Sequence, residues 1–198
     1  AERKILSEVL ESLQAHNLDP VTMEPDVSCL SRFICRVAPS VESRQSGTLF
    51  GILSNRNGYL IIPPASKGAG TQKSSAVRTF LVGPAQNRGE LLTREVLVTS
   101  ALIKSDEQVN HLKVFDSAGT VSHQQLGEKL GIESGEIRLI DTAGVENQVP
   151  DNGFEPVDYA IAYGAALALS EKGRRVNFRD DFNPFQGKKV KMQQALKF

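Results

Sequence analysis

Residues 48–63 read TLFGILSNRNGYLIIP, and this stretch predicts two antiparallel strands joined by a hairpin. Apolar residues dominate 48–53 and 59–63, and the polar segment SNRNG lies between them. The pair Asn57-Gly58 is a strong hairpin signal, because both residue types tolerate positive φ. A loop rich in Gly, Ser and Lys follows at 65–75, and a third strand is predicted at 76–82. The stretch therefore starts a three-stranded meander.

The hydrophobic period changes after this meander. Helices are predicted at 87–103, 123–130 and 156–170, with strands at 109–115 and 136–140 between them. Upstream, helices are expected at 2–16 and 26–37, with a short extended segment at 18–24 and a polar loop at 39–47. The expected inward positions of these helices are Ile5, Val9, Leu10, Leu13, Val27, Leu30, Phe33, Ile34, Leu91, Leu92, Val96 and Leu97. Three strands followed by α-β-α-β-α predict an α/β fold with a mixed sheet.

The helix at 156–170 is built largely from small residues. Its Ala and Gly positions are Ala160, Ala162, Gly164, Ala165, Ala166 and Ala168, so another backbone can approach it closely. Pro156 suits the first helical turn, and Gly173 is placed where a left-handed residue ends a helix.

Composition sets further limits. The 198 residues contain 23 basic and 23 acidic side chains, which argues against a general nucleic-acid binder. No apolar run approaches the length of a membrane span, and Ala1 in place of a Met suggests that a preceding region is missing. Cys29 and Cys35 are expected to be reduced core residues of one helix. Residues 172–198 hold eight Lys or Arg against two acids, so this end of the chain differs from the rest.

Three quoted segments resemble a known family. The run DYAIAYGAALAL at 158–169, followed by VNFRDDFNPFQGKK at 176–189, resembles the end of the actin-like cytoplasmic domain of PilM-type pilus proteins and GspL-type secretion proteins. The opening ILSEVLESLQAHNLDPVTMEPDVSCLSRF at 5–33 resembles the segment that bridges the two halves of that domain. The resemblance implies a ribonuclease-H-like, actin-like lobe of βββαβα order, preceded by a helix-strand-helix bridge.

This resemblance also implies an organisation of the chain. Residues 1–47 would be the bridging segment, residues 48–176 the second actin-like lobe, and residues 177–198 an Asn-Phe segment with a basic juxtamembrane tail. The residues expected near partners or the membrane are Asn177, Phe178, Phe182, Lys188, Lys189 and Lys191. A solvated terminus without a partner is the other interpretation of this basic tail.

Nucleotide chemistry is expected to be lost. The family pattern places an Asp near Gly51, which cannot hold a metal-bound water. A degenerate phosphate hairpin remains at Ser54, Asn55, Arg56, Asn57 and Gly58, and a degenerate adenosine turn at Ser117, Ala118 and Gly119. An ordinary polar hairpin is the competing interpretation of residues 54–58. His16, His111 and His123 are scattered, so neither a metal site nor a catalytic residue is predicted, and no cofactor is expected.

The expected function is a non-catalytic cytoplasmic scaffold associated with the bacterial inner membrane. It would link the platform proteins of a type IV pilus or type II secretion machine to the motor ATPase, and the sequence leaves open which machine and whether the chain forms a homodimer. The alternative is a nucleotide-binding actin-like ATPase or kinase whose catalytic half is missing. A ribonuclease-H-like nuclease is disfavoured, since 48–53 and 59–63 contain no acid to bind divalent metals.

Overall fold

The computed structural model describes residues 3–37, 47–63, 76–102, 109–137, 139, 155–169, 176–182 and 195–196. Contacts divide the chain into two units. The larger unit comprises residues 26–171, and the smaller one joins residues 1–25 to residues 172–198.

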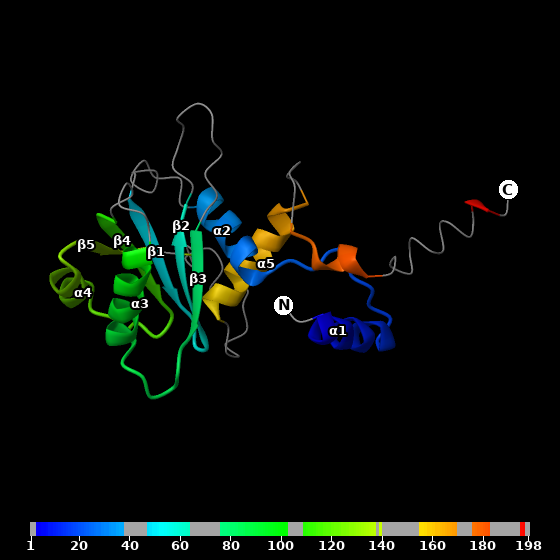
Figure 1. The fold of residues 1–198 in the computed structure, drawn as a ribbon, viewed down its shortest axis with the longest axis horizontal. Coiled ribbons are helices and arrows are strands. Elements are labelled where there is room, and N and C mark those ends of the chain that lie inside the picture. The colour runs from blue at the N-terminus through cyan, green and yellow to red at the C-terminus, as the bar shows by residue number, and fades with distance from the viewer. Residues whose placement is uncertain are drawn as a thin grey trace, which may run out of the picture. The chain divides into compact units, whose positions relative to one another are not determined.

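A five-stranded mixed sheet forms the centre of the larger unit, as the sequence predicts (Figure 1). Its strands are β1 (Thr48–Leu53), β2 (Asn57–Ile62), β3 (Ala76–Leu81), β4 (His111–Asp116) and β5 (Glu133–Glu136), in the order β3-β2-β1-β4-β5. The β1–β2 and β2–β3 pairs are antiparallel, whereas β4 runs parallel to both β1 and β5. The predicted succession of strands and helices is confirmed.

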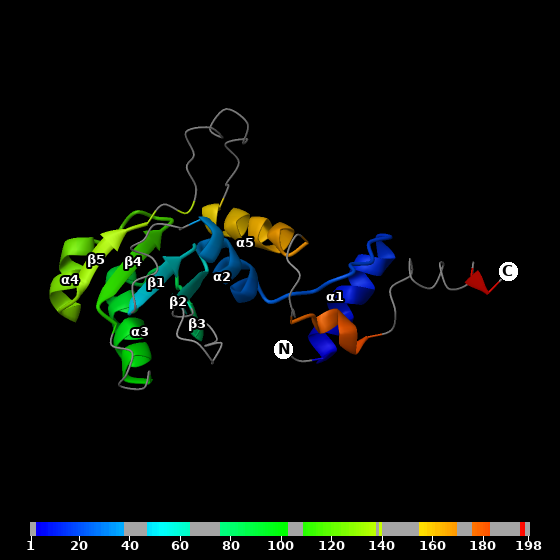
Figure 2. The same cartoon turned by 90° about the horizontal axis from the view of Figure 1, so that it is seen from above.

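Helices cover both faces of this sheet (Figures 1 and 2). Helices α3 (Arg88–Leu102) and α4 (His123–Leu130) share one core with Leu49 and Leu53 of β1. Helices α2 (Asp26–Val37) and α5 (Pro156–Leu167) share the second core with Phe50 and Ile52. Because β1 is buried on both faces, its sequence is a continuous apolar run without polar alternation.

Helices α2 and α5 approach each other backbone to backbone. A Cβ added at Gly164 of α5 would overlap the carbonyl oxygen of Cys29 in α2. The Arg32 guanidinium then reaches across to donate to the Gly164 carbonyl at 2.8 Å, which satisfies one of the free carbonyls at the end of α5. The small-residue helix therefore admits a close neighbour, as predicted, and the neighbour is α2.

A buried tyrosine connects α2 to the sheet. The Tyr59 hydroxyl of β2 donates to Asp26 Oδ2, 2.8 Å away at the start of α2. Burial, with the hydrogen bond and negative charge of Asp26, raises the pKa of Tyr59 far above its ordinary value. The phenol therefore keeps its proton and acts as a donor.

The smaller unit joins α1 (Arg3–Ala15) and the 3-10 helix η3 (Phe178–Asp181) to the residues between α1 and α2. Asn177 Oδ1 accepts the backbone N–H groups of Met23 at 2.9 Å and Arg179 at 3.1 Å. The Phe178 N–H in turn donates to the Met23 carbonyl at 2.9 Å. This pairing brings together segments that are more than 150 residues apart in the sequence.

Charged side chains support the same contact within the smaller unit. Buried Arg179 pairs with Asp19 at 3.2 Å, and Arg3 lies with its guanidinium carbon 5.5 Å from the centre of the Phe182 ring. These contacts position Asn177, Phe178 and Phe182 against the first 25 residues of the chain. Lys188, Lys189 and Lys191 lie outside the described residues, as do Gly173 and most of the predicted loops at 39–47 and 65–75.

Two predicted strand boundaries are wrong. The hairpin turn lies at Asn55-Arg56, and Asn57-Gly58 instead begins β2, because the Ser54 N–H closes the turn on the Asn57 carbonyl at 2.8 Å. The last strand is 133–136 instead of 136–140, because left-handed Gly131 ends α4 and the chain pairs with β4 soon afterwards. No strand forms at 18–24, where the chain is irregular.

Four expected inward positions are also wrong. Ile5 and Val9 of α1 are 54% and 42% exposed, because α1 buries only Leu10. Leu97 is 54% exposed, because the sheet-facing side of α3 is already formed by Leu91, Leu92 and Val96. Cys35 is exposed whereas Cys29 is buried, since six residues in a helix turn the two side chains to different sides. Neither cysteine is in a disulfide.

Candidate functional site at the ends of the central strands

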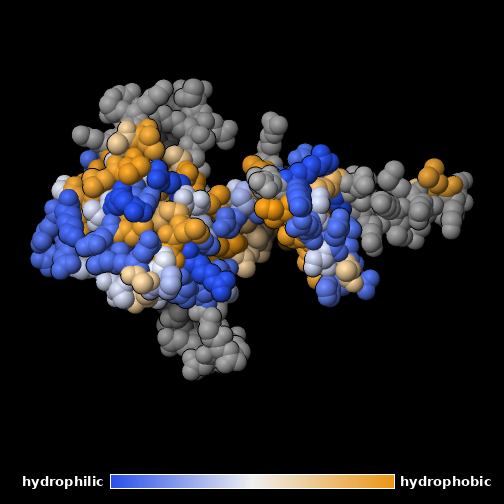
Figure 3. All heavy atoms as spheres, turned by 60° about the horizontal axis from the view of Figure 1, so that its bottom comes forward, coloured by the Kyte–Doolittle hydropathy of each residue, from blue (hydrophilic) through white to orange (hydrophobic). Residues whose placement is uncertain are grey.

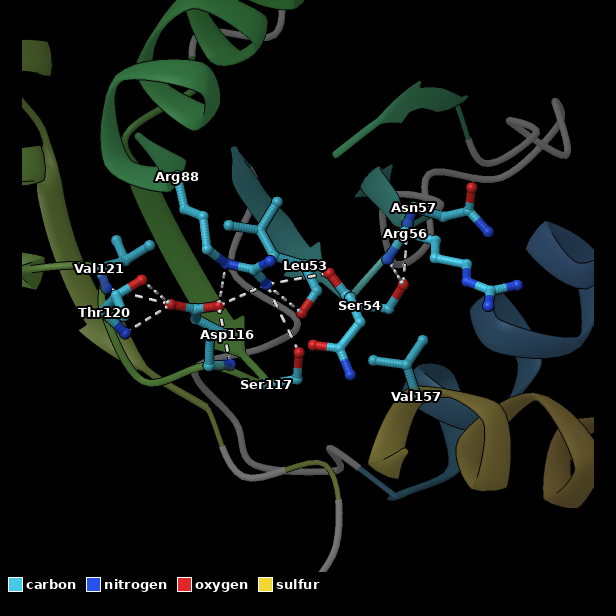
Figure 4. Close-up of polar contacts among 12 residues, drawn as sticks. Leu53, Ser54, Arg56, Asn57, Arg88, Asp116, Ser117, Thr120, Val121 and Val157 are labelled. Atoms are coloured by element: carbon cyan, nitrogen blue, oxygen red, sulfur yellow. Dashed lines mark hydrogen bonds and ion pairs between the residues drawn. The ribbon is translucent and has the colours of Figure 1, made fainter. Parts of the chain in front are cut away.

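Polar residues gather where the parallel strands β1 and β4 end (Figure 4). Ser54 follows β1, and Asp116 is the last residue of β4, directly before Ser117. Arg88 enters the same region from the first turn of α3. The carboxyl ends of parallel strands are where α/β sheets bind their ligands, so this cluster is the candidate site.

The Arg88–Asp116 ion pair is the centre of the site. Arg88 Nε and Nη2 lie 2.7 and 2.6 Å from Asp116 Oδ1, and the two side chains are only 11% and 4% exposed. Arg88 Nη2 also lies 3.0 Å from both the Leu53 and Ser54 carbonyl oxygens. One guanidinium therefore joins the end of β1 to the end of β4.

The Asp116 carboxylate is enclosed by donors on its other side. Its Oδ2 accepts the N–H groups of Thr120 at 2.7 Å and Val121 at 3.0 Å, and its Oδ1 accepts that of Ala118 at 3.2 Å. Burial alone would raise the pKa of Asp116, but the backbone N–H groups and Arg88 outweigh it and hold the pKa below its ordinary range. Asp116 is therefore ionised at neutral pH.

This turn contains the three residues predicted as a degenerate adenosine turn. Ser117 donates its N–H to the Leu53 carbonyl at 3.0 Å, and its Oγ lies 3.4 Å from Arg88 Nη2. Exposed Ala118 and Gly119 form the outer part, where Gly119 has a φ of +62°. The backbone donors of Ala118 and Thr120 face Asp116, so the turn is organised around a carboxylate of the chain itself.

The predicted phosphate hairpin is also occupied by side-chain oxygens. Ser54 Oγ accepts the N–H groups of Arg56 at 3.2 Å and Asn57 at 2.9 Å. The Asn55 N–H lies 3.3 Å from Glu155 Oε2, and the same carboxylate caps the first turn of α5. A carboxylate thus contacts the turn where a bound phosphate would accept the same N–H group.

Two glycines define the space around the hairpin. Gly58 lies under the Phe80 ring of β3, where an added Cβ would overlap the ring. At Gly51 an added Cβ would lie 3.1 Å from Leu92 Cδ1, in the apolar core below α3. The strand position where the family pattern expects an Asp therefore faces packed leucines instead of the polar cluster.

The described ranges contain neither a metal-binding cluster nor a membrane-spanning helix. No group of three or more His, Cys, Asp or Glu side chains in these ranges could hold a metal ion. His16 contacts the Ser12 carbonyl and His111 contacts Glu133, so the histidines do not converge. Among the helices of the described residues, none is both long and apolar enough to cross a bilayer.

Sequence reasoning located the two turns but missed the pair that organises them. Asp116 at a strand end and Arg88 at a helix start are each recognisable as polar residues next to apolar elements. Their separation of 28 residues gives no local signal that they pair. No protein-family model matches the chain, and neither does any protein in a search of curated sequences.

Proposed function

We propose that this chain is the second half of an actin-like cytoplasmic domain that works as a non-catalytic scaffold. It would link inner-membrane components of a type IV pilus or type II secretion platform to the motor ATPase. The principal support is the occupation of both nucleotide-type turns by the chain's own carboxylates, Asp116 in one and Glu155 in the other. The larger unit has a three-stranded antiparallel meander followed by parallel β4 and β5, with α3 before β4 and α4 before β5. This order agrees with the lobe expected from the resemblance.

Electrostatics explains why these carboxylates disfavour a nucleotide. A phosphate approaching the hairpin would meet Glu155 at the N–H group that it needs, and like charges repel. Displacing Asp116 would leave Arg88 buried without its anion, which costs several kcal/mol. The turns are therefore better suited to holding the lobe rigid than to exchanging a ligand.

A thermal-shift titration with Mg-ATP tests the absence of nucleotide binding. A ligand that binds only the folded state raises the melting temperature by mass action. We expect no shift up to millimolar Mg-ATP or inorganic phosphate. A concentration-dependent rise would overturn the non-nucleotide assignment and favour the ATPase or kinase alternative.

A vesicle experiment tests membrane association. The triple variant Lys188→Gln/Lys189→Gln/Lys191→Gln removes three charges from the basic tail and leaves the described residues unchanged. Each basic residue near an anionic surface contributes about 1 kcal/mol, so we expect at least a tenfold loss of cosedimentation with phosphatidylserine vesicles at low salt. Equal binding of the variant and the original chain would contradict the role of the tail. Co-purification with the motor ATPase then tests the proposed contact between this chain and that ATPase.

A further inference from the structure

Strand β3 forms one edge of the five-stranded sheet. Its inner side pairs with β2, and no strand of the described residues pairs with its outer side. The side chains of Val77 and Leu81 are 37% and 79% exposed, and Figure 3 shows apolar surface among polar surface on the displayed face of this unit. An edge of this kind can receive another strand.

The register shows which backbone groups of β3 are available. The Val82 N–H donates to the Arg56 carbonyl at 2.8 Å, so the pair Arg56–Val82 is hydrogen-bonded. Because hydrogen-bonded and non-hydrogen-bonded pairs alternate between antiparallel strands, the even-numbered residues of β3 bond to β2. The N–H and C=O groups of Val77, Thr79 and Leu81 consequently point to the outer edge.

The composition of β3 favours pairing. Its sequence AVRTFL contains no Pro, Lys, Asp or Glu, which are the residues that commonly protect an edge strand. Its only charge, Arg78, is held by Glu95 of α3, with Arg78 Nη2 2.9 Å from Glu95 Oε2. Arg78 therefore brings its own counter-charge to any strand that pairs here.

We propose that β3 pairs with β3 of a second copy of this chain, antiparallel and centred on Thr79. In this register the outward backbone groups of Val77 face those of Leu81 in the second copy. The outward groups of Leu81 face those of Val77 in the same way. The register places Thr79 opposite Thr79, a favourable cross-strand pair, and Arg78 opposite Phe80, which a guanidinium can contact. The two sheets would become one ten-stranded sheet with a twofold axis.

The neighbouring antiparallel registers fit less well. A pairing centred on Arg78 would set two arginines directly opposite each other, and like charges in that position are destabilising. A pairing centred on Phe80 would place Val77 opposite Gly83, beyond the end of the strand at Leu81. For two copies of this chain, the sequence of the edge therefore favours the register centred on Thr79. This inference does not depend on the proposed scaffold function.

Cysteine cross-linking tests this register. All variants carry Cys35→Ser, because Cys35 is exposed, while Cys29 is buried. Thr79→Cys would place two thiols on a hydrogen-bonded pair with Cα atoms about 5.5 Å apart, which a disulfide can span. Val77→Cys, on the same strand and face, would be roughly 14 Å from its copy and should not cross-link. We expect oxidised Thr79→Cys to run at twice the 21.6 kDa mass of the chain.

Sedimentation equilibrium supplies the second test. Leu81→Lys adds a charge to a side chain that is 79% exposed, so it should leave the fold intact and weaken the dimer at least tenfold. Thr79→Pro should act likewise, since the Thr79 N–H points away from β2. The inference is overturned if Thr79→Cys does not cross-link, or if Val77→Cys cross-links equally well. It is also overturned if a dimer forms that Leu81→Lys and Thr79→Pro leave unchanged.

Discussion

Arg88 Nη2 lies 2.6 Å from Asp116 Oδ1, and this buried ion pair joins α3 to the ends of β1 and β4. Among the described residues, every other oxygen or N–H group that these two side chains contact belongs to a turn or a strand end of the larger unit. The pair is therefore a structural link between three segments, at the place where a ligand would enter a catalytic member of this fold class.

Removing the arginine should destabilise the larger unit strongly. Arg88→Met leaves Asp116 buried without its counter-ion, and breaking a buried pair in this way costs about 3 to 5 kcal/mol. Urea denaturation followed by circular dichroism measures the change. Arg94→Met is the matched control: Arg94 is 64% exposed and Glu95 keeps Arg78, so the loss should stay below about 1 kcal/mol. Equal losses for the two variants would contradict a structural role specific to Arg88.

Acid should weaken the protein through Asp116. Its folded-state pKa lies below its ordinary value, so below about pH 4 the unfolded chain binds this proton more readily than the folded chain. The stabilisation is complete above the unfolded pKa of roughly 3.9 and is lost as pH falls through the folded pKa. Asp116→Asn should be less stable at pH 7 and should lose less stability on acidification. Urea midpoints between pH 2.5 and 7 measure this, and parallel curves for the two proteins would refute it.

Gly164 should not tolerate a methyl group. Gly164→Ala places a Cβ on the Cys29 carbonyl, so α2 and α5 must separate, and we expect a loss of about 3 kcal/mol or more. Gly89→Ala is the control in α3, where an added Cβ meets only Asn87 Oδ1 at 3.5 Å. Alanine is the better helix former, so this second change should be neutral or stabilising by up to about 1 kcal/mol. The melting temperatures of the two variants measure these changes, and equal melting temperatures would contradict the close contact at Gly164.

Asn177 should hold the smaller unit together. Asn177→Ala removes the acceptor of the Met23 N–H and the cap of η3, and such a cap contributes about 1 kcal/mol. We expect faster amide exchange in α1 and at 177–182, with unchanged exchange in β1 and β4. Asp180→Ala is the control, because it removes the Asp180 carboxylate that accepts from Asn177 Nδ2 at 2.8 Å and leaves Asn177 Oδ1 in place. Unchanged exchange at Met23 in the Asn177 variant would disprove this role.

Much of the fold could be predicted from local patterns. The helix at 123–130, the helix at 26–37 and the first strand at 48–53 have the predicted bounds, since side-chain periodicity and end signals act over a few residues. The errors at Asn57-Gly58 and at β5 arose because strand bounds depend on the partner strand. Ser54 closes the turn at Asn55-Arg56, two positions before Asn57-Gly58, and β4 fixes the residues with which 133–136 pair.

The sequence by itself determined the order of the elements, the small-residue face of α5 and the location of both polar turns. Only the tertiary structure decided what occupies those turns: Glu155 contacts Asn55 across 100 residues, and Arg88 reaches Asp116 across 28. It also placed Cys29 against Gly164 and put β3 at the edge of the sheet that the described residues form. The physical reason is the separation along the chain over which each kind of interaction acts. Backbone sterics and hydrophobic periodicity act between neighbours in the chain, whereas charge pairs and close backbone contacts form between segments that meet only after the chain has folded.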